Sequence, residues 1–175
     1  SLLHADMLRK HGRRSDGHCI RYFKASEFVR FGDSILDLAC GLGYGSHILY
    51  HSSLAKNIKG MDLCEDSIAY ANMYYSNENV SFEIGNAQAI SQIADNSIDF
   101  ITSFETIEHL PEPDKYLKEL YRVLKPSGRL MISAPNDWTD ETGQDPNPYH
   151  LHVYTLEKLK KECSQYFMIE KVYGQ

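Results

Sequence analysis

The stretch Ile35-Leu36-Asp37-Leu38-Ala39-Cys40-Gly41-Leu42-Gly43-Tyr44-Gly45 decides the fold. Its first five residues are apolar apart from the aspartate, as in a buried strand, and glycine then recurs at every second position. Glycine is needed in such a turn because a side chain would keep a ligand away from the backbone, and because the turn demands unusual dihedral angles. The stretch therefore predicts a strand that passes through a tight turn into a helix.

Short apolar runs alternate with segments of helical period on both sides of this stretch. We expect strands at 35–39, 57–63, 80–84, 98–103 and 129–134, and helices at 43–51 and 65–76. Pro113 and Pro126 bracket a third helix, whose apolar residues at 117, 120, 121 and 124 recur at helical spacing. This alternation is typical of an α/β fold with a parallel sheet covered by crossover helices.

The last forty residues predict a long loop and one more helix. The connection 135–154 contains Gly143, Pro146 and Pro148, and loops of this length within a domain are usually functional or disordered. Trp138 in this loop is a candidate platform for stacking on a sugar. Thr155 is a good N-cap for a helix that buries Leu156, Leu159 and Cys163, and a strand is expected near 167–172.

Length and composition fit one domain of ordinary size. The chain has 175 residues and a formal net charge of −6, which disfavours a nucleic-acid partner because such proteins usually present a basic field. Four cysteines without CxxC pairing, no secretory signal and no apolar run long enough for a membrane span predict a cytoplasmic protein. We expect a flexible arm at 1–17 and a single domain at 18–175. Because the chain opens with Ser1, we expect it to be part of a longer protein.

A carboxylate follows the glycine turn at the distance typical of nucleoside-binding sites. Asp62 ends the second expected strand about 20 residues beyond the glycines, where an acidic side chain can accept both hydroxyls of a ribose. The glycines fall at 41, 43 and 45, however, and not in the GxGxxG spacing that receives a pyrophosphate. A ligand with a pyrophosphate, such as a nicotinamide dinucleotide, is therefore disfavoured.

Several segments in a fixed order carry a family resemblance. Residues 36–43 resemble motif I of class I S-adenosylmethionine (SAM)-dependent methyltransferases, 60–63 the second motif, 85–87 the third, and 95–104 the fourth strand with its lead-in. Residues 18–25, 103–110, 122–128 and 147–150 resemble the methyltransferase type 11-like bacterial subgroup that is often joined to glycosyltransferases of surface-polysaccharide synthesis. The resemblance implies a Rossmann-like three-layer sandwich, with a mostly parallel sheet of strand order 3-2-1-4-5 and one late edge strand.

The resemblance also implies which residues hold SAM. Asp37 would orient the ammonium group, Gly41 and Gly43 would present backbone to the methionine moiety, and Asp62 would hold the ribose. The rest of the implied cofactor set is Leu63 on the adenine face, Asn86 and Ala87 at the adenine edge, and Ala39 and Phe104 at the ends of their strands. Ala39 stands where the family most often has glycine, and we expect it to keep ordinary strand dihedrals.

Fewer residues are candidates for catalysis than for binding SAM. His109 is the candidate general base, because imidazole can take a proton from a hydroxyl acceptor; packing or capping of its loop is the structural alternative. Tyr149 and His150 are candidates to contact the acceptor or to cover the cofactor, with simple loop packing as the alternative. Glu105, Glu108 and His109 fall at i, i+3 and i+4 and could share a helical face. Because a complete ligand set is not visible, we assign no metal.

The function expected from the resemblance is transfer of the SAM methyl group to a hydroxyl or amine, with a sugar or polysaccharide precursor as the acceptor. Two alternatives stay open: a non-catalytic SAM-binding module of a larger assembly, and an NAD-binding oxidoreductase domain. As partners we expect a small-molecule or glycan acceptor and a fused glycosyltransferase domain. Members of the family usually end with two strands, so the single late strand would leave an open sheet edge through which the chain could form a homodimer.

Overall fold

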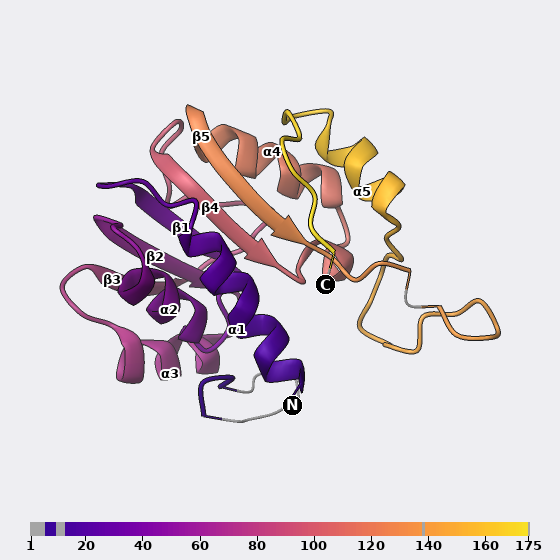
Figure 1. Cartoon of the computed structure of the whole chain (residues 1–175), viewed down its shortest axis with the longest axis horizontal. Helices are drawn as coiled ribbons and strands as arrows, with labels where there is room; N and C mark the ends of the chain where they lie inside the picture. The colour runs from indigo at the N-terminus through magenta and orange to yellow at the C-terminus, as the bar shows by residue number, and fades with distance from the viewer. Residues whose placement is uncertain (1–5, 10–12, 138, 175) are drawn as a thin grey trace.

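The computed structural model describes residues 6–9, 13–137 and 139–174, with side chains in the first helix described from Asp16 onward. Its elements are α1 (Arg13–Ser26), β1 (Ser34–Leu38), α2 (Tyr44–Ser52), β2 (Asn57–Asp62), α3 (Glu65–Tyr75), β3 (Val80–Ile84), β4 (Ile98–Phe104), η1 (Ile107–His109), α4 (Pro113–Val123), β5 (Leu124–Ser133) and α5 (Leu156–Cys163). The strands form one parallel sheet in the order β3-β2-β1-β4-β5 (Figure 1). The predicted fold class and strand order are confirmed.

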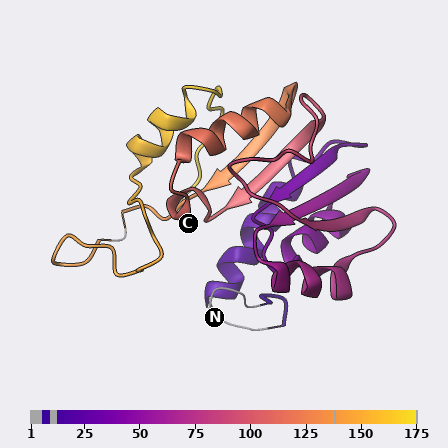
Figure 2. The ribbon, with the colours of Figure 1, turned by 180° about the vertical axis from the view of Figure 1, so that it is seen from behind.

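Helices cover both faces of this sheet, as the views from front and back show (Figures 1 and 2). On one face, Ile35 and Phe100 pack against α1, α2 and α3, whereas Leu36 and Ile101 point to the other face and pack against α4 and α5. Neighbouring residues of one strand point to opposite faces, so β1, β2 and β4 contribute buried residues to both cores. This double burial explains why the strands read as almost continuous apolar runs in the sequence.

The carboxyl ends of all five strands lie along one edge of the sheet, because every neighbouring pair is parallel. The chain winds outward from β1 to β3 and then crosses back to β4 on the other side of β1. Such a reversal leaves a crevice outside the carboxyl ends of the two central strands, which is where ligands bind in open α/β sheets. The candidate site is therefore sought where β1, β2 and β4 end.

The long connection between β5 and α5 projects from this same edge and forms the orange loop of Figure 1. Its base is closed by a hydrogen bond from the Asp137 amide to the Tyr154 carbonyl (2.7 Å). Farther along, the amides of Leu151 and His152 both donate to the Glu108 carbonyl, at 2.8 and 3.1 Å. These bonds attach the end of the loop to η1. The predicted stacking role of Trp138 lies outside the described residues.

The late strand predicted at 167–172 is wrong. Residues 164–174 contain no strand, and all side chains from Met168 to Gly174 are exposed, so this segment has no buried face that a strand could use. Instead the chain passes close to the end of α1, where the ring of Tyr173 lies 6.2 Å from that of Phe28. The sheet of the described chain therefore has five strands, with β3 and β5 at its edges.

Two boundaries also differ from the prediction. The expected division at residue 17 falls inside α1, and Asp6 ahead of that helix is buried, where it accepts hydrogen bonds from the hydroxyls of Tyr70 (2.8 Å) and Tyr75 (2.6 Å). Residues 6–9 thus pack on the domain. The fifth strand begins at Leu124, five residues before the predicted start, because it follows α4 without a loop.

Among the described residues, no helix is both long enough and apolar enough to cross a membrane.

Candidate active site

The turn after β1 takes the left-handed conformation at three positions. The φ angles are 62° at Ala39, 54° at Gly41 and 82° at Gly43. The expectation that Ala39 keeps ordinary strand dihedrals is therefore wrong: the strand ends at Leu38, and the chain must bend there to bring the Cys40 amide to the Met61 carbonyl at 3.0 Å. An alanine in this conformation carries strain that a glycine would not, of about 1–2 kcal/mol.

The three glycines of the turn meet different surroundings. A Cβ atom on Gly41 would have nothing within 4 Å, so this backbone faces open space. A Cβ on Gly43 would lie 2.7 Å from the Cβ of Ala71, and one on Gly45 would lie 2.0 Å from the ring of Tyr22. Gly41 thus leaves room for a ligand, whereas Gly43 and Gly45 let α2 pack closely on its neighbours.

Asp37 lies beneath the turn and is fully buried. Its carboxylate accepts three hydrogen bonds from hydroxyl groups, of Ser46 (2.7 Å), Thr102 (2.9 Å) and Tyr22 (3.1 Å). Burial raises the pKa of Asp37 to about 6, and the three hydroxyl donors oppose that rise. Both oxygens are engaged within the protein, so Asp37 fixes the position of the turn; the contact with a ligand ammonium stays a prediction.

Asp62 joins the turns that follow β1 and β2. One of its oxygens accepts from the Gly41 amide and the other from the Cys64 amide, both at 2.9 Å. The carboxylate is only partly buried, and each oxygen retains a second lone pair. Next to it the side chain of Leu63 is 71% exposed. An open glycine backbone, a carboxylate and an exposed apolar side chain thus lie together at the carboxyl ends of β1 and β2.

The third predicted motif follows β3 and is tied to this group. The Gly85 amide donates to the Asp62 carbonyl at 3.0 Å, and a Cβ at this position would lie 2.1 Å from the Cε of Met61, so the end of that side chain would have to move. Asn86 is exposed, and its side-chain oxygen accepts from the Gln88 amide (2.9 Å). Ala87 is half-buried and packs against the core on the α4 side.

The end of β4 completes the floor of the site. The ring of Phe104 is buried and meets the ring of Tyr22 edge-on, with centroids 4.9 Å apart. Glu105 follows in the left-handed conformation, with a φ of 51°. Its carboxylate accepts from the Ser133 hydroxyl (2.7 Å) and pairs with Arg21 at 3.3 Å. Strained residues of this kind are concentrated at functional sites.

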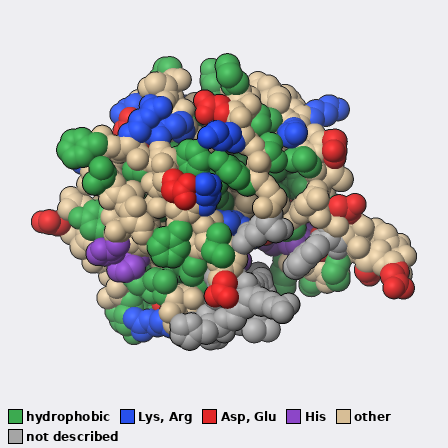
Figure 3. Space-filling model, in the orientation of Figure 1, with side chains coloured by type: hydrophobic (Ala, Val, Ile, Leu, Met, Phe, Trp, Pro, Cys, Tyr) green, Lys and Arg blue, Asp and Glu red, His purple; other side chains and the backbone are tan. Residues whose placement is uncertain are grey.

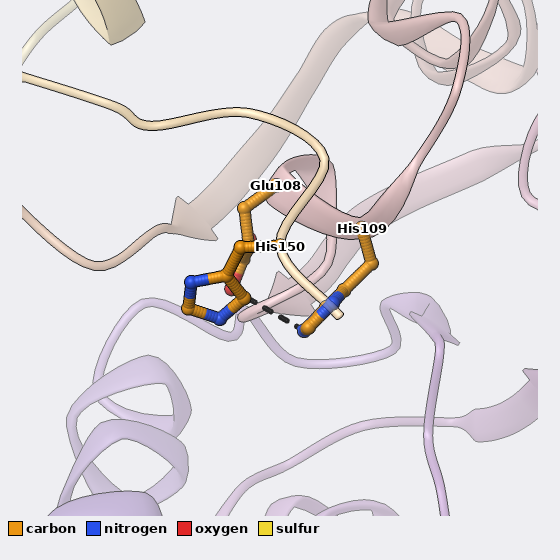
Figure 4. Close-up of side chains that lie close together, drawn as sticks. All are labelled: Glu108, His109 and His150. Carbon is orange, nitrogen blue, oxygen red and sulfur yellow. Dashed lines mark ion pairs between the residues drawn. The ribbon is translucent and has the colours of Figure 1, made fainter. Parts of the chain in front are cut away.

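Three side chains converge where the long loop meets η1: Glu108, His109 and His150 (Figure 4). We call them the Glu108 cluster. One potential ligand atom from each lies within 4.8 Å of the others. The carboxylate of Glu108 is 1% exposed and neither oxygen has a hydrogen-bond partner among the described residues; the nearest histidine nitrogen, Nε2 of His109, is 3.8 Å away. Burial raises the pKa of Glu108 to about 8.

The two histidines of the cluster are oriented by acceptors. Nδ1 of His109 lies 2.8 Å from the Tyr149 carbonyl, and Nδ1 of His150 lies 2.6 Å from the Asp145 carboxylate. The structure thus brings His109 and His150 together, as candidates of one site. Tyr149 contributes its backbone carbonyl, while its side chain is exposed. Of the residues considered for a metal, Glu105 is absent from the cluster because it is bonded to Ser133.

Sequence reasoning missed the hydrogen-bond partners of Asp37 and of His150. A charged side chain within an apolar strand must find donors, so Asp37 signalled that hydroxyl residues would surround it, but not which ones. Asp145 carried no signal, because its role depends on how the long loop folds.

The comparisons with known proteins agree on one family. The sequence profile described as "Methyltransferase domain" matches residues 31–173. A probable S-adenosylmethionine-dependent methyltransferase of Mycolicibacterium smegmatis is 32% identical over 130 residues, which are 73% of this chain and 49% of that protein. The ubiquinone biosynthesis O-methyltransferase of Pseudomonas entomophila is 26% identical over 132 residues, or 74% and 53% of the two chains. The chain thus spans about half the length of these relatives.

Solved structures show the same fold. The PH0226 protein of Pyrococcus horikoshii superposes with a TM-score of 0.75 at 23% identity, covering 94% of this chain and 86% of that one. Phosphoethanolamine N-methyltransferase 2 of Haemonchus contortus, solved with S-adenosyl-L-methionine, gives a TM-score of 0.73 at 20% identity, covering 86% and 36%. At such identities these structures compare the fold alone.

Proposed function

The chain belongs to the SAM-dependent methyltransferase family, and from this premise we propose that it binds SAM along the carboxyl ends of β1 and β2 and transfers the methyl group to a hydroxyl or amine acceptor. The observation that carries the proposal is the open backbone of Gly41, held by Asp62 and flanked by the exposed Leu63. These three residues fit the parts of an adenosyl ligand in order: backbone for the methionine end, carboxylate for the ribose, and an apolar side chain for the adenine.

Each of these residues has a defined task in binding. The free lone pairs of Asp62 accept the ribose hydroxyls, while its bonds to Gly41 and Cys64 keep the carboxylate from rotating. Leu63 covers one face of the adenine, which removes apolar surface from water. Asn86 and Ala87 line the adenine edge, and Phe104 with Ala39 close the floor near the methionine end. When bound, SAM supplies a sulfonium that activates its methyl group, so the protein mainly positions the acceptor in line with it.

An uncharged acceptor fits the surroundings better than a phosphorylated one. The long loop, which extends to the right of the space-filling view, carries exposed acidic side chains (Figure 3); Asp137, Asp140 and Glu141 are among them. These charges repel phosphate groups. A hydroxyl of a sugar, as the subgroup resemblance implies, or of an aromatic ring, as the ubiquinone O-methyltransferase relative suggests, meets this requirement.

His109 is the residue that we assign to the acceptor side. The Tyr149 carbonyl can only accept a hydrogen bond, so the proton of neutral His109 lies on Nδ1 and the lone pair of Nε2 is available. Nε2 of His109 can therefore take the proton of an acceptor hydroxyl as the oxygen attacks the methyl group.

Calorimetric titration with SAM, its demethylated product S-adenosylhomocysteine and NAD tests the binding step. We expect both adenosyl ligands to bind and NAD not to bind. Asp62→Ala should weaken SAM binding about tenfold or more, because a hydrogen bond to a charged group is worth about 1.5–3 kcal/mol. Asp66→Ala, an exposed carboxylate on α3, is the matched control. Leu63→Ser, which alters an exposed side chain only, should weaken binding without affecting folding.

Turnover is tested by release of S-adenosylhomocysteine in the presence of sugar and phenol acceptors. SAM binding without release for any hydroxyl or amine would support the alternative of a non-catalytic module. Binding of NAD in preference to SAM would overturn the proposal.

A further inference from the structure

In the Glu108 cluster, the carboxyl group of Glu108 and a ring nitrogen of each histidine lie against one another. The Asp145 carboxylate beside His150, like the carbonyl beside His109, accepts and does not donate, so each ring carries its proton on Nδ1. Nε2 of His109 therefore has an available lone pair, Nε2 of His150 accepts from the Asn147 side-chain amide at 2.8 Å, and the carboxyl group of Glu108 adds two oxygens with no hydrogen-bond partner among the described residues.

Leaving a buried carboxylate without any partner is unfavourable, since a buried polar group without a hydrogen bond costs about 1–3 kcal/mol or more if it is charged. Glu108 is not an isolated surface carboxylate, for it lies at 1% exposure and faces the two imidazoles. A cation bound by the three side chains would satisfy all of these groups at once. Two imidazole nitrogens and one carboxylate oxygen are a ligand set typical of divalent transition metals such as Zn²⁺.

We propose that Glu108, His109 and His150 form a binding site for a divalent transition-metal ion of the Zn²⁺ type, with at least one coordination position left open. Tetrahedral ligands at metal bonds of about 2.1 Å are about 3.4 Å apart, so the cluster, with ligand atoms within 4.8 Å, must contract by roughly 1 Å at its longest side. Small rotations of the three side chains achieve this.

The surroundings match those of metal-binding histidines. Such residues commonly donate their second ring nitrogen to a carboxylate or a backbone carbonyl, which fixes the tautomer and the orientation of the ring. Here Asp145 holds His150, and the Tyr149 carbonyl holds His109. The amide nitrogen of Asn147 lies 2.8 Å from Nε2 of His150, and the metal replaces this one hydrogen bond.

The role of the metal in methyl transfer rests on the proposed function. An acceptor hydroxyl bound at the open position becomes more acidic and loses its proton to solvent, after which its oxygen attacks the methyl group and the C–S electron pair returns to sulfur. His109 then acts as a ligand and not as a base.

Metal binding is measured directly on the purified chain after treatment with EDTA. We expect one Zn²⁺ per chain by calorimetry, and with Co²⁺ a visible absorption spectrum typical of nitrogen and oxygen ligands. Glu108→Gln and His150→Ala should each reduce Zn²⁺ affinity about 100-fold or more, and Asp145→Asn, a positioning variant, about 10- to 100-fold with unchanged stoichiometry. The matched controls, His51→Ala and Glu112→Gln, change exposed residues of the same types outside the cluster and should bind Zn²⁺ like the original chain.

Titration of the same proteins with SAM separates this proposal from the proposed function. The cluster variants should keep their SAM affinity, which also shows that they are folded. Absence of Zn²⁺ and Co²⁺ binding by the original chain would overturn the metal site and leave SAM binding intact. Zn²⁺ binding that His150→Ala does not weaken would overturn it as well, whereas failure to bind SAM would overturn only the proposed function.

Discussion

Two buried carboxylates lie at the carboxyl edge of the sheet, and the protein treats them in opposite ways. Asp37, in the glycine-turn region, accepts hydrogen bonds from three hydroxyls. Glu108, where η1 meets the long loop, accepts none among the described residues. Both are almost free of solvent contact. The bonding capacity of Asp37 is met within the protein, so this side chain serves as a scaffold for the turn; the bonding capacity of Glu108 is not met, which is a property of sites that bind something.

The largest difference in the free energy of unfolding should appear when Asp37 and Glu108 are each replaced by alanine. Asp37→Ala leaves three buried hydroxyls without an acceptor and should lower the free energy of unfolding by at least about 3 kcal/mol. Glu108→Ala breaks no hydrogen bond and relieves a buried carboxylate, so we expect a change of about 1 kcal/mol or less in the absence of metal. Urea denaturation measures both. Equal losses in the two variants would break the comparison.

The pH dependence of stability should come next in size. Burial raises the pKa of Asp37 to about 6, whereas an unfolded aspartate titrates near 4. The native state therefore binds more protons than the unfolded state between these values, and this contribution to stability is lost as the pH rises from about 4 to about 6. A rise of two units corresponds to about 3 kcal/mol as an upper figure.

Asp37→Asn removes this titrating group. Compared with the original chain, the variant should show a shallower fall in stability between about pH 4 and pH 6, because Glu108, whose pKa burial raises to about 8, still contributes. Parallel stability curves for the two proteins would assign the pH dependence to other groups.

A smaller effect is expected from glycine substitutions in the two regions. In Gly45→Ala the new methyl group would lie 2.0 Å from the ring of Tyr22 and would push that ring away from Asp37, at a cost of about 2–3 kcal/mol. Gly143→Ala, in the long loop, meets no atom within 4 Å and should cost only about 1 kcal/mol from its φ of 79°. A loop substitution as costly as the turn substitution would contradict this view of a tightly packed scaffold.

The smallest effect concerns the two left-handed residues that follow β1 and β4. Ala39→Gly should raise the free energy of unfolding by about 0.5–1 kcal/mol, because it relieves backbone strain and removes only a methyl group. Glu105→Gly relieves the same kind of strain but loses the contacts of the carboxylate with Ser133 and Arg21, so no net gain is expected. Thermal unfolding of both variants checks the difference in sign.

The parts of the fold that depend on local pattern could be predicted. Strand order, the helices after the glycine turn, and the N-cap at Thr155, whose hydroxyl accepts from the Lys158 amide at 3.2 Å, follow from periodicity, capping and motif order. The strand at 167–172 was predicted wrongly: a short run with apolar residues suits a strand, but a strand also needs a buried face, and the residues from Met168 to Gly174 are all exposed.

The candidate site likewise has one part that could be predicted from the sequence and one part that could not. The residues expected to meet SAM follow consecutive strands, so parallel topology alone brings them to one edge. The conformation of Ala39 was not predicted, because alanine gives no sign of a left-handed backbone. The Glu108 cluster joins residues 42 positions apart in the chain, and no spacing in the sequence predicts that His150, and not Glu105, would face Glu108. Such a contact depends on the tertiary fold of the loop.

The hydrogen bonds at the two ends of the long loop have a consequence for how specificity can change. The Asp137 amide closes the loop at its base, and the Glu108 carbonyl holds Leu151 and His152 at its other end. The position of His150 is therefore fixed without hydrogen bonds from the tip, residues 139–144. Lengthening a loop whose ends are already joined costs little free energy. The tip can therefore change in length or sequence without disturbing the hydrogen bonds that hold the root of the loop, which makes it a natural place for directed evolution to begin.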